Sequence, residues 1–172
     1  AQPAYNVITL TRAPLAGAAQ ATFQTRVTDS MFITGNQVVP TPTPFGTQFF
    51  ARHAVLWARD AATTELPLPP GVNPAWNVEW YGQDVNNAGD VLVLVSDPAG
   101  ATLALRNRTF VRSHATGVYT EYTVTNLPTF NRWYGAYLLD DGTVLGTATD
   151  ASTSAPSLIR WTSTTTAQVI AL

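Results

Sequence analysis

The chain has 172 residues, enough for one domain with a hydrophobic core, and charged residues make up only 12% of it. Nine arginines, no lysine and eleven acidic residues give a net charge of −2 without a basic cluster, so the electrostatic signature of nucleic-acid binding is missing. The sequence also contains no cysteine, which excludes disulfides, thiolate metal sites and cysteine nucleophiles.

The composition predicts an all-β fold. The chain holds 26 threonines, five tryptophans and six tyrosines, and such branched and aromatic side chains favour the half-buried surface of a sheet. No apolar run approaches the roughly 18 to 20 residues of a membrane-spanning helix, so we expect no membrane span. The sequence begins at Ala1 without a methionine, which is typical of an exported protein after signal-peptide cleavage. We therefore expect a secreted or cell-surface location.

Strand-length runs follow one another along the chain, separated by turn residues. The predicted strands are Tyr5–Leu10, Thr22–Val27, Gln48–Trp57, Thr64–Leu68, Asn77–Val85, Asp90–Val95, Thr102–Leu105, Tyr119–Val124, Trp133–Leu138, Val144–Ala148, Ser157–Trp161 and Ala167–Leu172. Between the second and third of these runs, Pro40, Pro42 and Pro44 alternate with threonine. This alternation excludes a central strand and predicts an extended loop.

Internal repetition is the most informative feature of the sequence. Trp80-Tyr81-Gly82 recurs as Trp133-Tyr134-Gly135, at a shift of 53 residues. The same shift places Gly89-Asp90-Val91-Leu92 on Gly142-Thr143-Val144-Leu145 and Asp97 on Asp150. Several landmarks at one constant offset indicate duplicated structural units, and four strands in about 50 residues are the size of a propeller blade.

We predict one domain over residues 1–172, built from three four-stranded antiparallel repeat units and an extra C-terminal strand. The units cover about residues 5–60, 63–115 and 118–163, and the extra strand covers 166–172. Because three blades do not close a propeller, we expect a homo-oligomer in which this strand is exchanged between chains. The alternatives are a three-sheet prism-like or sandwich monomer, and a fibre that grows by the same exchange.

A stretch in the middle of the chain resembles a known repeat. Three segments carry the resemblance, in chain order: His53-Ala54-Val55-Leu56-Trp57, Glu65-Leu66-Pro67-Leu68, and Asp84 to Leu92 with its Asn-Asn-Ala-Gly turn. Together they are similar to the bacterial extracellular HAF repeat. That unit has an HAF-x-W strand, a Leu-Gly turn and a Gly-Ile-Asn-Asn-x-Gly-x-Val hairpin. The chain departs from it at Asp84, where the repeat has a small residue. The resemblance implies exported, propeller-like repeats and brings no catalytic residues.

The chemistry-bearing residues offer little support for a metal or nucleophile site. Asp84, Asn86 and Asp90 place oxygen atoms around Gly89, as a calcium loop does, but this spacing also makes a tight hairpin, which we favour. The two histidines, 53 and 114, lack ligand spacing, and no G-x-S-x-G elbow is present. We expect no metal, no cofactor and no catalytic residues.

Two aromatic clusters occupy equivalent positions in the second and third predicted units. Aromatic rings bind sugar faces and anchor protein interfaces, and they also pack between blades. The candidate ligand-binding residues are Trp76, Trp80, Tyr81, Trp133 and Tyr134, with Trp76 the first choice. The leading hypothesis is an exported, non-enzymatic β-repeat module for recognition or assembly that binds a glycan or a protein.

Two other functions stay open. One is a structural surface or fibre subunit that assembles by terminal strand exchange. The other is a carbohydrate-active enzyme that uses a pair of carboxylates from Glu65, Glu79, Asp84 and Glu121.

Overall fold

A computed structural model describes residues 20–58, 63–75, 77–98, 100, 102 and 106–170, with their side chains except those of 20–27 and 49. Its twelve elements are all strands, which confirms the all-β prediction. They are β1 (Gln20–Val27), β2 (Ile33–Pro42), β3 (Gln48–Trp57), β4 (Thr63–Glu65), β5 (Glu79–Val85), β6 (Val91–Ser96), β7 (Asn107–Arg112), β8 (Tyr119–Tyr122), β9 (Phe130–Leu138), β10 (Val144–Asp150), β11 (Pro156–Trp161) and β12 (Ala167–Val169).

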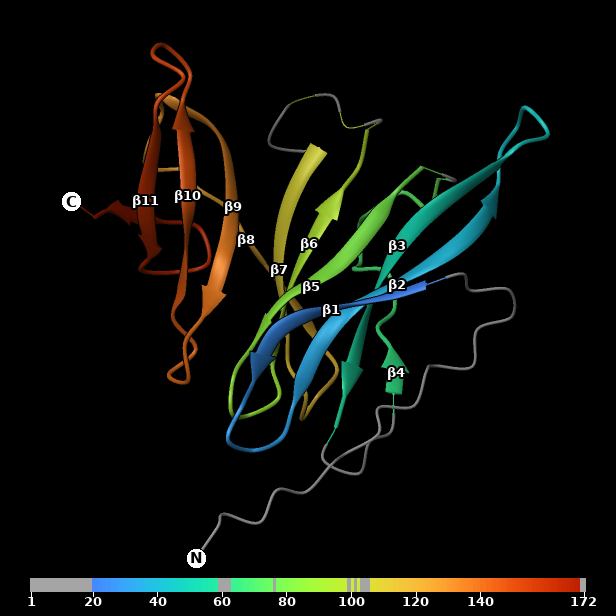
Figure 1. Cartoon of the computed structure of the whole chain (residues 1–172). Coiled ribbons are helices and arrows are strands. Elements are labelled where there is room, and N and C mark those ends of the chain that lie inside the picture. Colours follow the sequence, from blue (N-terminus) through green and yellow to red (C-terminus); the bar gives the residue numbers. More distant parts are fainter. Residues whose placement is uncertain are drawn as a thin grey trace, which may run out of the picture.

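The strands form two open sheets. The first has eight strands in the order β1-β2-β3-β5-β6-β7-β8, with β4 paired to β3. The second has four strands in the order β12-β11-β10-β9. In Figure 1 the four-stranded sheet stands beside β6 and β7, and β9 packs against β5, β6 and β7.

Strands that are consecutive in the chain form three antiparallel runs, β1–β4, β5–β8 and β9–β12. A single parallel pair, His53 with Trp80, joins the first two runs into one sheet. The predicted unit boundaries are therefore wrong by one strand. The strand at Thr64–Leu68, placed at the start of the second unit, pairs as β4 with β3, the strand before it, and so belongs to the first run.

The prediction for the terminal strand is also corrected. We predicted that residues 166–172 form a strand without a unit of its own, yet β12 pairs with β11 inside the same chain. The side chain of Asn126 fixes it further: its amide nitrogen donates to the Ala167 carbonyl at 2.8 Å, and its oxygen accepts from the Ala167 N–H at 2.9 Å. An exchange of this strand between chains would have to break these bonds.

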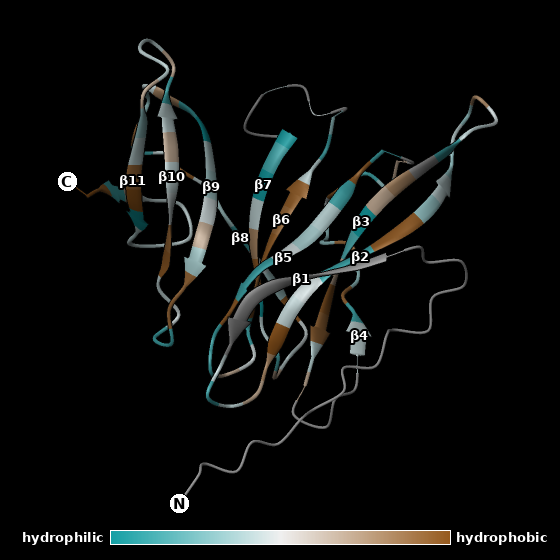
Figure 2. Ribbon diagram, in the orientation of Figure 1, coloured by the Kyte–Doolittle hydropathy of each residue, from teal (hydrophilic) through white to brown (hydrophobic). Residues whose placement is uncertain are grey.

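Two hydrophobic cores lie between the successive runs. β6 separates them and is buried on both faces, as its unbroken apolar sequence indicates; it carries a hydrophobic stretch in Figure 2. Val91, Val93 and Val95 face the first core, and Leu92 faces the second. The first core also holds Ala54, Leu56, Leu66, Val72, Val78, Val85 and Phe110, and the second holds Val124, Leu138, Val144, Ala148, Ile159, Trp161 and Ala167.

The proline-rich segment is partly a strand, contrary to the predicted loop. Pro40 and Pro42 belong to β2 and pair with Phe50 and Gln48 of β3. They lie beyond the last residue of β2 that pairs with β1, which is Val38. Among the described residues, β2 pairs at that end with β3 alone, so on its other side the missing proline N–H groups interrupt no described ladder.

Several predictions reach beyond the described part of the chain, and the predicted terminal strand is described only as far as residue 170. The strand Tyr5–Leu10 lies outside the described residues, as does Trp76. Of the predicted strand Thr102–Leu105, only Thr102 is described, and the strand of this region, β7, begins at Asn107.

Candidate functional site

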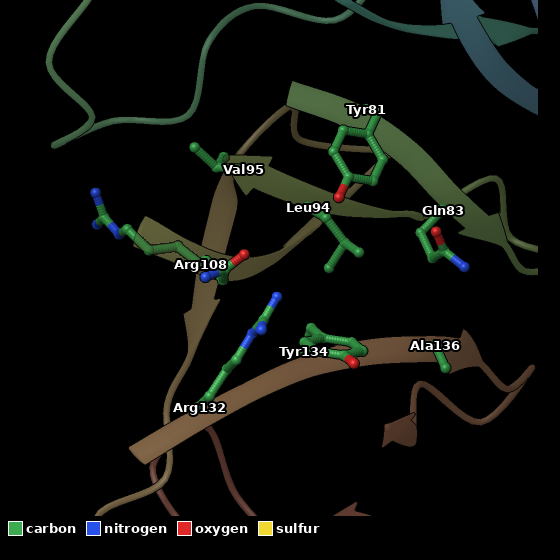
Figure 3. A pocket seen from close by; sticks show the side chains of 10 residues that line it. Tyr81, Gln83, Leu94, Val95, Arg108, Arg132, Tyr134 and Ala136 are labelled. Atoms are coloured by element: carbon green, nitrogen blue, oxygen red, sulfur yellow. The ribbon is translucent and has the colours of Figure 1, made fainter. Parts of the chain in front are cut away.

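The repeat motif places its two tyrosines in one cleft. Tyr81 on β5 and Tyr134 on β9 both line a cavity of about 270 Å³ between the second and third antiparallel runs. We call it the tyrosine cleft. Its other lining residues are Gln83, Leu94, Val95, Asn107, Arg108, Arg132, Gly135 and Ala136. In Figure 3 the Tyr81 hydroxyl points from β5 toward β9, and Arg132 rises from β9 into the same space.

The local sequence explains how these groups meet. Side chains alternate along a strand, so Gln83 shares the face of Tyr81 on β5, and Arg132 shares the face of Tyr134 on β9. Asn107 begins β7, beside Ser96 at the end of β6. Gly135 lets β9 approach closely, because a Cβ there would lie 2.9 Å from a Leu92 methyl carbon. The cleft thus forms where the glycine brings β9 against β6 and β7.

Each tyrosine ring lies under an arginine. The guanidinium carbon of Arg52 is 4.8 Å from the Tyr81 ring centroid, and that of Arg132 is 5.6 Å from the Tyr134 centroid. Burial raises the pKa of the Tyr81 hydroxyl above its usual value near 10, with Arg52 acting in the opposite direction. The Tyr81 hydroxyl therefore stays neutral at physiological pH and can both donate and accept a hydrogen bond.

Two arginines near the cleft are already neutralised by carboxylates. Arg52 donates from Nε and Nη2 to the two oxygens of Glu79 at 3.0 and 3.1 Å, and this hydrogen bonding raises the Arg52 pKa. Arg108 donates to both oxygens of Glu121 at 2.7 Å, and its Nη1 donates to the Gly71 carbonyl at 2.8 Å. Both carboxylate pairs are bidentate, the strong and directional form of this interaction.

The two tryptophans of the motif lie against the cores. Trp80 stacks on the ring of His53 at a centroid distance of 3.8 Å, and its indole N–H donates to the Leu66 carbonyl at 2.8 Å. Trp133 is half-buried and packs against the second core. Of the four described candidates, the structure therefore brings Tyr81 and Tyr134 together and assigns packing contacts to the tryptophans.

Trp80 and His53 also line a second cavity. It measures about 450 Å³ and is lined further by Thr41, Leu68, Pro74, Ala75 and Val78. His53 Nδ1 lies 2.7 Å from a Glu65 oxygen. The cavity wall is mostly apolar, and its polar side chains are the Thr41 hydroxyl and this histidine.

The four carboxylates named above as candidates for a carbohydrate-active enzyme all have partners. Glu65, Glu79 and Glu121 pair with His53, Arg52 and Arg108, respectively. Asp84 is buried, and its Oδ2 accepts the Leu138 N–H at 2.8 Å. Each group thus has a structural contact that fixes it.

The predicted hairpin turns are confirmed. Gly89 and Gly142 have positive φ angles of 82° and 83°, the conformation that glycine adopts without strain. The turns also contact each other, because the Asn87 N–H and side-chain amide donate to the two oxygens of Asp140 at 2.9 and 2.8 Å. These two residues are 53 positions apart, which is the repeat shift. Within the described residues, no group of three metal-ligating side chains occurs.

Sequence reasoning missed the polar part of the cleft. Arg132 and Gln83 could have been found, since each lies two residues from a motif tyrosine on the same strand face. Asn107 gives no such signal, because its position depends on the pairing of β7 with β6.

Comparison of the chain with protein-family models, with curated proteins and with solved structures finds no match. The resemblance to HAF repeats stays a prediction. Among the described residues, no helix is long and apolar enough to cross a membrane.

Proposed function

We propose that this chain is an exported, non-enzymatic recognition module that binds a carbohydrate in the tyrosine cleft. The observation that carries the proposal is the meeting of Tyr81 and Tyr134 in one cavity with amide and guanidinium side chains around them. Aromatic rings accept the apolar face of a sugar, and convergent polar groups accept its hydroxyls. A volume near 270 Å³ is at the small end of ligand sites, which suits a single sugar ring of a longer glycan.

We propose further that the three antiparallel runs are successive blade-like units of an open array. Gly82 of β5 faces Thr34 and Gly35 of β2, and Gly135 of β9 faces Leu92 and Thr109 one run earlier. The Gly135 N–H donates to the Thr109 hydroxyl at 3.0 Å. The glycine of each Trp-Tyr-Gly motif therefore lies in close contact with the preceding antiparallel run.

Homo-oligomerisation is a separate proposal. Because β12 is paired within its own chain, assembly by strand exchange requires that pairing to open. Light scattering on the intact chain tests it: a monomer mass of about 18.5 kDa would exclude a stable oligomer.

The carbohydrate proposal is tested on a glycan array, followed by calorimetry with the strongest glycan. Tyr81→Ala and Tyr134→Ala should each weaken binding about tenfold, because each removes one aromatic wall. Tyr137→Ala is the matched control, since Tyr137 lies on β9 with 58% of its surface exposed and does not line the cleft. An array without any bound glycan, or equal losses in all three variants, would overturn the proposal.

A further inference from the structure

The charge of the tyrosine cleft is unbalanced. None of its ten lining residues is acidic, whereas two are arginines. Arg108 contributes little free charge, because Glu121 binds it through both carboxylate oxygens. Arg132 is exposed, and no carboxylate of the described residues forms an ion pair with it. Among the lining residues, Arg132 therefore carries a positive charge that no lining carboxylate balances, in a chain whose overall charge is negative.

The position of Arg132 suits ligand binding. Its guanidinium lies over the Tyr134 ring, and this contact restricts the long side chain without using its N–H donors. Figure 3 shows it directed into the space between β9 and β5. Arg132 thus presents a planar set of donors beside the ring that would accept a sugar face.

The chain itself shows which anion such an arginine binds. Arg52 and Arg108 each hold a carboxylate through two parallel N–H···O bonds. The guanidinium fork matches the two oxygens of a carboxylate in this geometry. Since no carboxylate of the described part of the chain forms an ion pair with Arg132, the carboxylate that binds it can come from the ligand.

We infer that the ligand of the tyrosine cleft is an acidic carbohydrate, a hexuronate residue whose carboxylate binds Arg132 while its ring lies between Tyr81 and Tyr134. Gln83 and Asn107 supply amide groups for the ring hydroxyls. This inference rests on the proposed function, because it specifies the carbohydrate that the same cleft takes.

The test uses oligosaccharides of galacturonate, glucuronate and mannuronate, each with its methyl ester, and a sulfated galactan. The ester keeps the ring and removes the charge. We expect at least one free acid to bind about tenfold or more tightly than its ester, with an affinity that falls as NaCl rises. Arg132→Gln should weaken binding of that acid at least about tenfold and weaken binding of its ester much less, so that the two affinities converge. Arg160→Gln is the control, since Arg160 is exposed and lies outside the cleft.

The outcomes separate the two proposals. If neutral sugars and esters bind as tightly as the acids, the cleft is a carbohydrate site and the inference about the carboxylate is wrong. Binding of the sulfated galactan without any uronate would also overturn it, because the anion would then be a sulfate. If no sugar binds, the proposed function itself fails. Arg132→Gln without effect on acid binding would assign the charge preference to another residue and overturn the role of Arg132.

Discussion

Asp84 links the second and third runs through its side chain, and replacing it should destabilise the whole fold. Only 4% of its surface is exposed. Its Oδ2 accepts the Leu138 N–H of β9 at 2.8 Å, and its Oδ1 accepts the N–H of Val85 at 2.9 Å. Both donor residues are fully buried, so water cannot readily replace the carboxylate.

The expected magnitude follows from these two bonds. Asp84→Ala removes the acceptor of two buried N–H groups, and each such loss costs about 1 to 3 kcal/mol. Relief of the buried carboxylate's desolvation offsets part of this, so we expect a loss of about 2 to 4 kcal/mol in the free energy of unfolding. Asp84→Asn keeps the shape and one acceptor oxygen, and should lose about half as much.

Urea unfolding followed by tryptophan fluorescence measures both variants. Asp29→Ala is the control, because Asp29 is an exposed carboxylate in the first hairpin turn and its loss should change stability by about 0.5 kcal/mol or less. If Asp84→Ala is no less stable than Asp29→Ala, the link between β5 and β9 does not stabilise the fold and the reasoning is refuted.

Three further predictions concern residues outside the tyrosine cleft. Hydrogen bonds from Ser152 and Thr153 lower the pKa of the exposed Asp150 carboxyl to about 2. The contribution of this carboxylate to stability is therefore present above the usual carboxyl range and is lost as the pH falls toward 2. Ser152→Ala should raise the Asp150 pKa in an NMR titration. Trp80→Phe removes the indole N–H and should cost about 1 to 3 kcal/mol in urea unfolding while sugar binding in the cleft stays unchanged, and a loss of binding without a loss of stability would contradict its packing role. Asn126→Ala should speed hydrogen exchange in β12, and unchanged exchange would show that this side chain does not hold the strand.

The sequence by itself determined the local elements of this protein. Its branched and aromatic composition predicted the strands, because these side chains fit a pleated sheet. Gly89 and Gly142 predicted two hairpin turns, since each turn needs a positive φ that other residues adopt at a cost. The repeated Trp-Tyr-Gly motif, found from the shift of 53 residues, contains Tyr81 and Tyr134, and the structure places these two tyrosines in one cleft.

Only the tertiary structure decided which strands belong together and where the site lies. β4 pairs with β3 and β12 pairs with β11, in each case the preceding strand of the chain. Whether such a strand joins the run before it or opens the next one depends on the packing of the whole chain, so the strand's own residues do not reveal it. Pro40 is acceptable in β2 because no strand of the described residues pairs with it on the β1 side, which is likewise a property of the sheet. The tyrosine cleft joins β5–β7 to β9 and includes Asn107, which nothing in its sequence neighbourhood marks. A strand's sequence fixes which of its faces is apolar, whereas the neighbour that covers that face is chosen by the packing of the whole chain.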